Sequence, residues 1–148
     1  MKDALLFQLS MQQKSKRILH NQKWSKMIDL DSTYLIFRYS DKMCQSCLDS
    51  DLALISEWEN MVGKGRVLIL PCIDINRNNI IKVKSLLSHF KYSLIPDTLL
   101  EIPMNDDGIL CRYFGLLDNE KNIKEIYFPN EDRNITAFYL HSLIDRVQ

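Results

Sequence analysis

The chain has 148 residues, a formal net charge of zero at pH 7 and 46% hydrophobic residues, which is typical of one globular domain with a substantial core. A neutral chain has no excess charge with which to attract nucleic acid or an anionic membrane surface. No apolar run approaches the roughly 20 residues needed to cross a bilayer, and no signal peptide opens the chain, so the sequence as printed predicts a cytoplasmic protein. The same features would fit the soluble part of an anchored or exported protein whose leader is absent.

Residues 1–30 are expected to form an N-terminal helical extension, because residues 1–28 contain neither glycine nor proline. The segment is basic through Lys14, Lys16, Arg17, Lys23 and Lys26. The simpler interpretation is a helix packed on the outside of the domain with its basic face in water. The alternative is a helix that docks on a membrane or a partner, since basic charges beside an anionic membrane gain roughly 1 kcal/mol each.

The remaining residues predict alternating strands and helices. Tyr34–Tyr39 is apolar on both faces except at Arg38, which favours a central strand. A helix is expected from Cys44 to Met61, and Gly63-Lys64-Gly65 ends it with residues that tolerate a left-handed cap. The next apolar run should pair in parallel with the first strand and complete a βαβ unit. The other expected elements are a strand at 66–73, a helix at 79–90, paired strands at 110–117 and 123–128, and a closing helix at 135–147.

Two of the four cysteines, Cys44 and Cys47, form a Cys-x-x-Cys pair at the start of the first expected helix. Four cysteines are too few for a disulfide-stapled scaffold. At a helix N-terminus, unpaired N–H groups and the helix dipole favour a thiolate over a thiol. The pair is therefore predicted to be redox-active, with Cys44 as the exposed attacking thiolate and Cys47 as the more buried resolving thiol.

The other two cysteines, Cys72 and Cys111, stand apart from the pair. Cys72 ends an apolar strand and is interpreted as a small core residue. Cys111 is interpreted either as core filler or as a third redox thiol. A structural zinc site needs four ligands with short paired spacing, which the chain does not offer, so neither a metal nor another cofactor is expected.

The order strand, helix, strand, helix, β-hairpin, helix, with Cys-x-x-Cys opening the first helix, resembles the thioredoxin fold over residues 33–147. The stretches YLIFRYSDKMCQSC, RYFGLLDNEKNIKEIYFP and ITAFYLHSLI resemble the thioredoxin-like thiol–disulfide oxidoreductase domains of Bacteroidetes-type bacteria. The resemblance implies that residues 31–148 form a three-layer α/β/α sandwich with a central mixed sheet. It also implies a protein disulfide or dithiol as substrate and a place behind an envelope anchor.

Three departures from that family concern the pair itself. Met43 and Gln45-Ser46 replace the family's Trp and Gly-Pro, so its reduction potential cannot be carried over. Arg38 stands where thioredoxin has a buried Asp, and Arg112 is expected at the place of the cis-proline that faces the pair, with Pro96 as the rival position. If Arg112 holds that place, two guanidinium groups would favour the thiolate, and Cys111 would face Cys44.

Two other functions remain open from the sequence. In a peroxiredoxin-like thiol peroxidase, Cys47 would attack peroxide with the help of Arg112, and Cys44 would occupy the family's Thr or Ser position. The other alternative is a redox-inactive interaction module with a vestigial pair. Asp49 and Asp51 are expected in the first turn of the cysteine helix, where acids favour the helix dipole, and Asp49 is a lesser candidate for proton relay. The three histidines, His20, His89 and His141, are interpreted as surface or structural residues.

Overall fold

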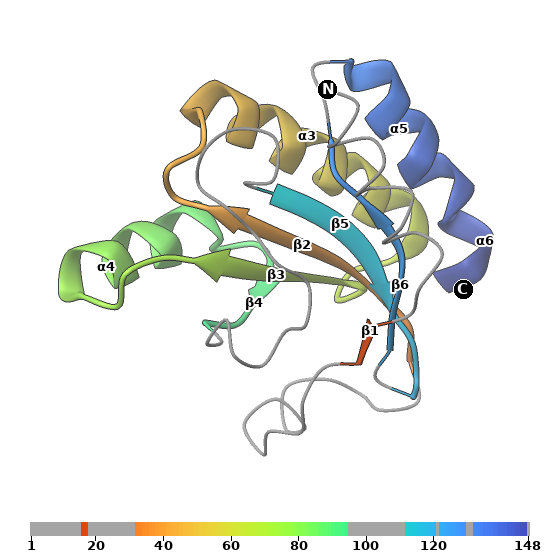
Figure 1. Cartoon of the computed structure of the whole chain (residues 1–148), viewed down its shortest axis with the longest axis horizontal. Helices are drawn as coiled ribbons and strands as arrows, with labels where there is room; N and C mark the ends of the chain where they lie inside the picture. The colour runs from red at the N-terminus through yellow and green to blue at the C-terminus, as the bar shows by residue number, and fades with distance from the viewer. Residues whose placement is uncertain (1–15, 18–31, 95–111, 121, 130–131, 148) are drawn as a thin grey trace.

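The structure is a computed structural model in which residues 16–17, 32–94, 112–120, 122–129 and 132–147 are described. Its strands form one mixed sheet in the order β1-β6-β5-β2-β3-β4, and helices α3 to α6 accompany it in the described ranges (Figure 1). The class is therefore α/β. The elements are β1 Lys16–Arg17, β2 Tyr34–Ser40, α3 Gln45–Val62, β3 Val67–Cys72, α4 Arg77–Leu86, β4 Lys91–Tyr92, β5 Arg112–Leu117, β6 Asn122–Tyr127, α5 Arg133–Ser142 and α6 Ile144–Val147.

Strand β2 is the central strand that its sequence predicts. It pairs in parallel with β3 and antiparallel with β5, and all seven of its residues are buried. Helix α3 connects β2 to β3, so the predicted βαβ unit is confirmed. Gly63 follows the helix with φ 126° and ψ 146°, a positive-φ conformation that side chains other than glycine rarely adopt.

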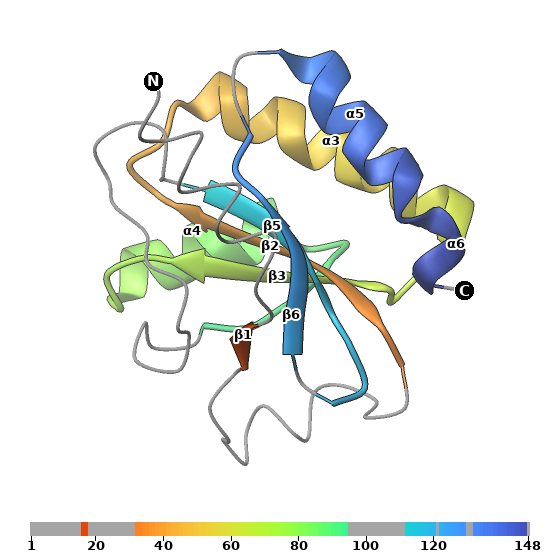
Figure 2. The same ribbon diagram turned by 45° about the vertical axis from the view of Figure 1, so that its right-hand side comes forward.

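The four helices lie against one face of the sheet. Successive side chains of a strand point to opposite faces, and Leu35, Phe37 and Tyr39 of β2 share a core with side chains from every helix. Figure 2 shows α3, α5 and α6 side by side above the sheet. The second helical layer of the expected sandwich is not among the described residues. The helices and their C-caps contribute to this core Leu48, Leu52, Ile55, Trp58, Val83, Leu87, Leu140, Leu143 and Val147.

Aromatic packing and hydrogen bonds fix α5 over this face. The Nε1–H of Trp58, which is 1% exposed, donates to the Leu140 carbonyl at 2.8 Å. The rings of Tyr127 and Tyr139 stack with centroids 4.7 Å apart, and the Tyr139 hydroxyl donates to the Glu125 carbonyl at 2.6 Å. These contacts hold the C-terminal half of α5 against α3 and β6.

The N-terminal prediction is wrong at residues 16–17, which form strand β1 and not helix. Strand β1 pairs antiparallel with β6, with Lys16 opposite Ile123. The open edge of a sheet offers unpaired N–H and C=O groups, and pairing with them competes with a helix of weak periodicity. The rest of the predicted N-terminal helix, and the residues from 95 to 111, lie outside the described part of the chain.

The later helices differ from their predictions at their ends. Helix α4 ends at Leu86, because the chain turns into β4 and pairs Lys91 with Leu68 of β3. The predicted closing helix is divided at Leu143 into α5 and α6. Phe138, an apolar residue of this helix, is 77% exposed, since it lies two positions from the buried Leu140 and so points to the other side of the helix.

Candidate functional site

The two cysteines lie at the N-terminus of α3, as predicted. The loop from β2 turns at Ser40, whose carbonyl accepts a hydrogen bond from the Met43 N–H at 3.2 Å. Cys44 is the N-cap residue, and its carbonyl accepts the first helical hydrogen bond, from the Leu48 N–H at 3.0 Å. The Cys44 thiol is exposed and the Cys47 thiol is partly buried. The pair therefore presents one accessible and one sheltered sulfur.

Hydrogen bonding lowers the pKa of Cys44 to about 7. The largest contribution comes from the Cys47 thiol and the next from the Ser46 hydroxyl, whose oxygen lies 2.9 Å from the Cys44 sulfur. The N–H groups of Cys47 and Ser46 add smaller contributions, although the side chain makes no capping hydrogen bond. A thiol with this pKa is substantially ionised at neutral pH.

The pKa of Cys47 moves the other way and is raised. Its hydrogen bond to Cys44 is the largest cause, followed by burial and by the charge of Cys44. Arg112 opposes the shift and Asp51 adds to it. Cys44 is therefore the thiol that loses its proton first, and Cys47 keeps its proton at neutral pH.

A cavity of about 240 Å³ lies beside Cys47. Helix α3 supplies most of its wall, the first residue of β5 supplies another part, and the N-terminal turn of α5 supplies the rest. Hydroxyl and charged groups dominate its polar surface. The lining residues are Ser46, Cys47, Ser50, Asp51, Arg112, Arg133 and Thr136.

Two arginines fix the polar wall of this cavity. The Nε atom of Arg112 lies 2.6 Å from Oδ2 of Asp51, and the two side chains are 15% and 7% exposed. These two atoms meet as an ion pair and not as an aligned hydrogen bond. Arg133 donates to the Ser50 hydroxyl at 2.8 Å and to the Ser50 carbonyl at 3.0 Å. Burial raises the pKa of Asp51, while Arg112 and then Arg133 oppose that shift.

The structure brings together only part of the predicted set. Arg112 reaches the cavity of Cys47, but Arg38 lies on the opposite face of the sheet, because its neighbours Phe37 and Tyr39 face the helices. The pKa of neither paired cysteine responds to Arg38. The expected cluster of two guanidinium groups around the pair is therefore not formed.

The other cysteines do not join the site in the described residues. Cys72 ends β3 opposite Ser40, on the Arg38 face, where both Cys72 and Arg38 affect the pKa of Tyr113. Cys72 is only partly buried, so it is less enclosed than the predicted core residue. Cys111 and Pro96 lie outside the described ranges.

Sequence reasoning missed Asp51 and Arg133. The first turn of α3 contains no acidic residue, so the expected dipole role of Asp49 and Asp51 is wrong. Asp49 is exposed and accepts a hydrogen bond from Gln45 at 2.9 Å, whereas Asp51 is 5% exposed. One signal could have identified Asp51, which lies four residues after Cys47 and so on the same side of the helix. No local pattern identifies Arg133.

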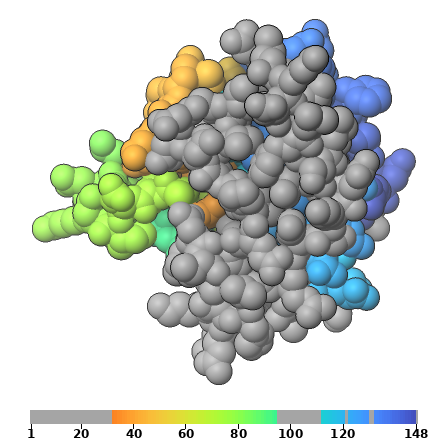
Figure 3. Space-filling view, viewed as in Figure 1, coloured from red at the N-terminus to blue at the C-terminus, as the bar shows by residue number. Residues whose placement is uncertain are grey.

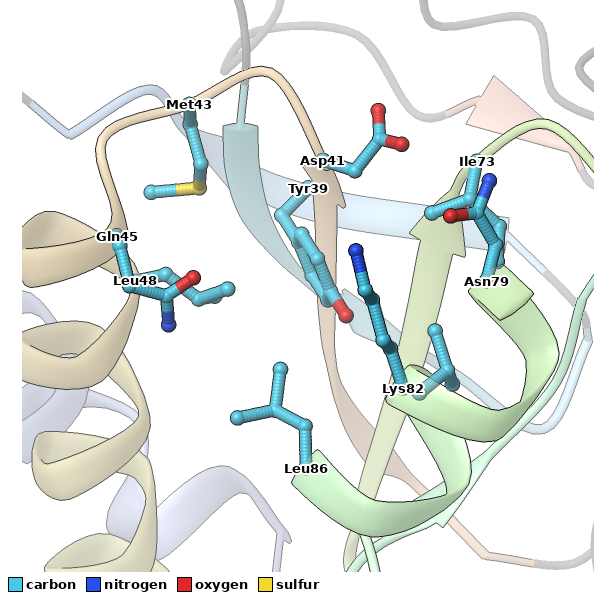
Figure 4. A pocket seen from close by; sticks show the side chains of 10 residues that line it. Tyr39, Asp41, Met43, Gln45, Leu48, Ile73, Asn79, Lys82 and Leu86 are labelled. Atoms are coloured by element: carbon cyan, nitrogen blue, oxygen red, sulfur yellow. The ribbon is translucent and has the colours of Figure 1, made fainter.

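A second cavity, of about 190 Å³, lies on the other side of the Cys44 loop, between α3 and α4 (Figure 4). Met43 and Gln45, the sequence neighbours of Cys44, both line it. Figure 4 shows Leu86 of α4 facing Leu48 of α3 across the hollow, with Lys82 beside Tyr39. In the space-filling view, the segment leading into α3 lies next to the surface of α4 (Figure 3). The exposed thiol therefore lies between two hollows.

Comparison with known proteins gives no relative: no family model, curated protein or solved structure matches the chain. Among the described residues, no helix has the length and apolar character needed to span a membrane. The described ranges also contain no group of three or more His, Cys, Asp or Glu side chains arranged to hold a metal ion.

Proposed function

We propose that the protein is a thioredoxin-like thiol–disulfide oxidoreductase with Cys44 as nucleophile and Cys47 as resolving thiol. The observation that carries this proposal is the opposite behaviour of the two thiols at the start of α3: the pKa of exposed Cys44 is lowered to about 7, and that of sheltered Cys47 is raised. The element order around them, β2-α3-β3-α4, the short strand β4, the β5–β6 hairpin and α5, supports the thioredoxin-like assignment.

The proposed reaction is two successive thiol–disulfide exchanges. The Cys44 thiolate attacks one sulfur of a substrate disulfide, so that a Cys44–substrate bond forms and the first substrate thiolate leaves. The Cys47 sulfur then attacks Cys44, forms the Cys44–Cys47 disulfide and releases the second substrate thiolate. Two electrons pass from the pair to the substrate, and the reverse sequence oxidises a substrate dithiol. No bound cofactor takes part.

A protein disulfide is the proposed substrate, and the cell envelope is its proposed location by resemblance to the Bacteroidetes-type domains. Exposure of Cys44 supports a macromolecular substrate, because the sulfur is reachable without entry into a closed site. The hollow that Met43 and Gln45 line gives room for chain on one side of the reacting sulfur.

The peroxidase alternative fits this site less well. It needs Cys47 as a thiolate, and the hydrogen bond to Cys44 and burial raise the pKa of Cys47. It also needs Arg112 for the peroxide, whereas Arg112 is paired with Asp51. That alternative predicts that Cys44→Ser still forms a sulfenic acid on Cys47 at low peroxide. The oxidoreductase proposal predicts that Cys44→Ser loses the rapid thiol reaction.

Thiol counting after mild oxidation tests the proposal. In a Cys72→Ser/Cys111→Ser background, diamide should convert the two remaining thiols into one intramolecular disulfide. Cys47→Ser in the same background should trap a mixed disulfide with a model disulfide protein, and Cys44→Ser should not. If Cys44 and Cys47 stay reduced while the protein remains folded, the dithiol mechanism is wrong.

A further inference from the structure

The resolving step of the proposed exchange has a proton to remove. Cys47 must attack as a thiolate, because the thiolate is the nucleophile in disulfide exchange. In the mixed disulfide Cys44 is no longer a thiolate, so of the causes that raise the pKa of Cys47 only burial and the charge of Asp51 remain, and Arg112 opposes them. The ordinary pKa of a cysteine thiol, about 8.5, already lies above neutral pH, so the Cys47 sulfur still carries a proton at this step. A base within reach of Cys47 would therefore speed the second step without changing the first.

Among the described residues that line the cavity beside Cys47, one side chain can act as this base. The ionisable lining residues other than Cys47 are Asp51, Arg112 and Arg133. A guanidinium group stays protonated and cannot accept a proton, and a neutral hydroxyl is too weak a base. Of the lining residues that the structure describes, only Asp51 remains, through its carboxylate. Asp51 lies one helical turn after Cys47 on α3, so the two side chains leave the helix on the same side.

The surroundings of Asp51 suit a carboxylate that alternates between its two protonation states. The groups that face it are Cys47 on its own helix, Arg112 from β5 and Arg133 from α5. Burial favours the neutral acid, and the two arginines favour the carboxylate. The cavity of about 240 Å³ is large enough to hold water, and the Asp51 carboxylate, the two arginines and the hydroxyl groups that line it are polar partners for that water.

We propose that Asp51, held in place by Arg112, accepts the proton of Cys47 during resolution of the mixed disulfide. This inference rests on the proposed disulfide exchange. The proton moves from the Cys47 sulfur to a carboxylate oxygen of Asp51, directly or through cavity water. The sulfur electron pair then forms the bond to Cys44, and the electrons of the broken disulfide leave with the substrate sulfur. Asp51 returns its proton to that thiolate or to water.

A chromogenic disulfide separates the two steps. In the Cys72→Ser/Cys111→Ser background, 5,5′-dithiobis(2-nitrobenzoate) should release one nitrothiobenzoate when Cys44 attacks and a second when Cys47 resolves the mixed disulfide. Asp51→Asn should leave the pH profile of the first phase in place and slow the second at least about tenfold at neutral pH, since general-base help is commonly worth 10²–10⁴. The difference in second-phase rate between Asp51→Asn and the parent protein should shrink as the pH rises, because hydroxide then removes the Cys47 proton in place of Asp51.

The direction in which Asp51→Asn changes the rate of the second phase distinguishes proton transfer from a purely electrostatic role of Asp51. The negative charge of Asp51 raises the pKa of Cys47, so an electrostatic role alone predicts a faster second phase in Asp51→Asn. A second phase as fast as in the parent protein, or faster, would overturn the inference and leave the proposed function standing. Absence of the second phase in the parent protein itself would instead refute the dithiol mechanism.

Asp49→Asn is the matched control, because Asp49 is an exposed carboxylate two residues away on the same helix. It should leave both phases unchanged. Asp51→Glu, which keeps an acid, should retain more of the second phase than Asp51→Asn. If the Asp51 variants do not fold, the parent protein still decides: the second phase should be slower in D₂O than in H₂O, and a rate that is equal or faster in D₂O would contradict the inference.

Discussion

Arg38 and Arg112 lie on neighbouring strands, with Arg112 opposite Tyr39 and Arg38 opposite Tyr113 in the β2–β5 register. They are one step of the register apart, and for that reason their side chains face opposite sides of the sheet. Arg112 reaches the cavity of Cys47 and pairs with Asp51. Arg38 is 1% exposed on the other face, where it acts on the pKa of Tyr113. Both faces are buried, but the described helices and both cysteines of the pair belong to only one of them.

This difference shows that adjacency in a sheet does not assign a residue to a site. The side-chain period of a strand is two, so a residue one step along the strand belongs to the other face. The two arginines are therefore expected to affect different properties: Arg112 the chemistry of the pair, and Arg38 the stability of the opposite face. Substitutions on each face test that separation.

Replacing Arg112 by Leu should have the largest effect. Removal of one partner from a buried ion pair commonly costs about 3–5 kcal/mol, and Asp51 is left without its nearest cation. The pKa of Asp51 is already raised in the native state. The contribution of Asp51 to the free energy of unfolding is therefore greatest at low pH and is lost as the pH rises. Without Arg112 the pKa rises further, so the deficit in Arg112→Leu should grow from acid to neutral pH. Urea unfolding at the two pH values measures it.

Arg38→Leu is the control for the chemical effect of Arg112. Alkylation of Cys47 in a Cys44→Ser background should keep its pH dependence in Arg38→Leu. In Arg112→Leu the apparent pKa of Cys47 should rise, because the cation that lowers it is gone. If both arginine substitutions changed the apparent pKa of Cys47 equally, the idea that each arginine acts only on its own face of the sheet would be wrong.

Gly115→Ala should have an intermediate effect, at the β5–β6 contact. A Cβ at this position would lie 2.7 Å from Cγ2 of Ile123 and 3.4 Å from the Lys124 carbonyl oxygen. Overpacking of this kind typically costs about 1–3 kcal/mol. The loss should be seen in the urea midpoint while alkylation of Cys44 stays unchanged. Ile123→Ala removes the clashing atom, so the double variant should be more stable than the sum of the single losses predicts.

Ser46→Ala should have a smaller effect, confined to the site. The Ser46 hydroxyl is the second contributor to the lowered pKa of Cys44, after the Cys47 thiol. Its removal should move the pKa of Cys44 part of the way from about 7 toward 9. Iodoacetamide rates as a function of pH give the value, and the urea midpoint should not move. An unchanged pKa would mean that the 2.9 Å contact does not act on the thiolate.

Phe138→Ser should have the smallest effect, although it removes a large apolar group. Phe138 is 77% exposed on the outer side of α5, and surface substitutions usually change stability by less than about 0.5 kcal/mol. Leu140→Ala on the same helix provides the contrast, since Leu140 is 3% exposed and a buried leucine typically costs about 2–5 kcal/mol. Similar losses from the two variants would contradict the assigned orientation of α5.

The sequence predicts the framework well because its signals are local. Continuous apolar runs indicate β2 and β3, the spacing from Leu48 to Trp58 indicates α3, and Asp118 to Asn122 indicates the turn of the hairpin. The position of Cys44 and Cys47 follows from that order alone. These signals depend only on residues close together in the chain.

The composition of the cavity could not be predicted in the same way. Asp51 becomes notable only when Arg112 from β5 is placed against it, and Arg133 only when α5 is docked on α3. The opposite assignment of Arg38 depends on which face of β2 the helices cover. Each of these facts concerns segments that lie far apart in sequence and meet only through the sheet.

The hydrogen bonds between α3 and α5 also have a consequence for the order of folding. Trp58 and Leu140 are separated by 82 residues, and Ser50 and Arg133 by 83. Such distant contacts form slowly, because a long loop must close before they can stabilise the chain. The helix with the cysteine pair can form early, but the wall of its cavity is complete only after α5 has docked. During synthesis, the Cys44 thiol would therefore be available before the cavity that we assign to proton transfer exists.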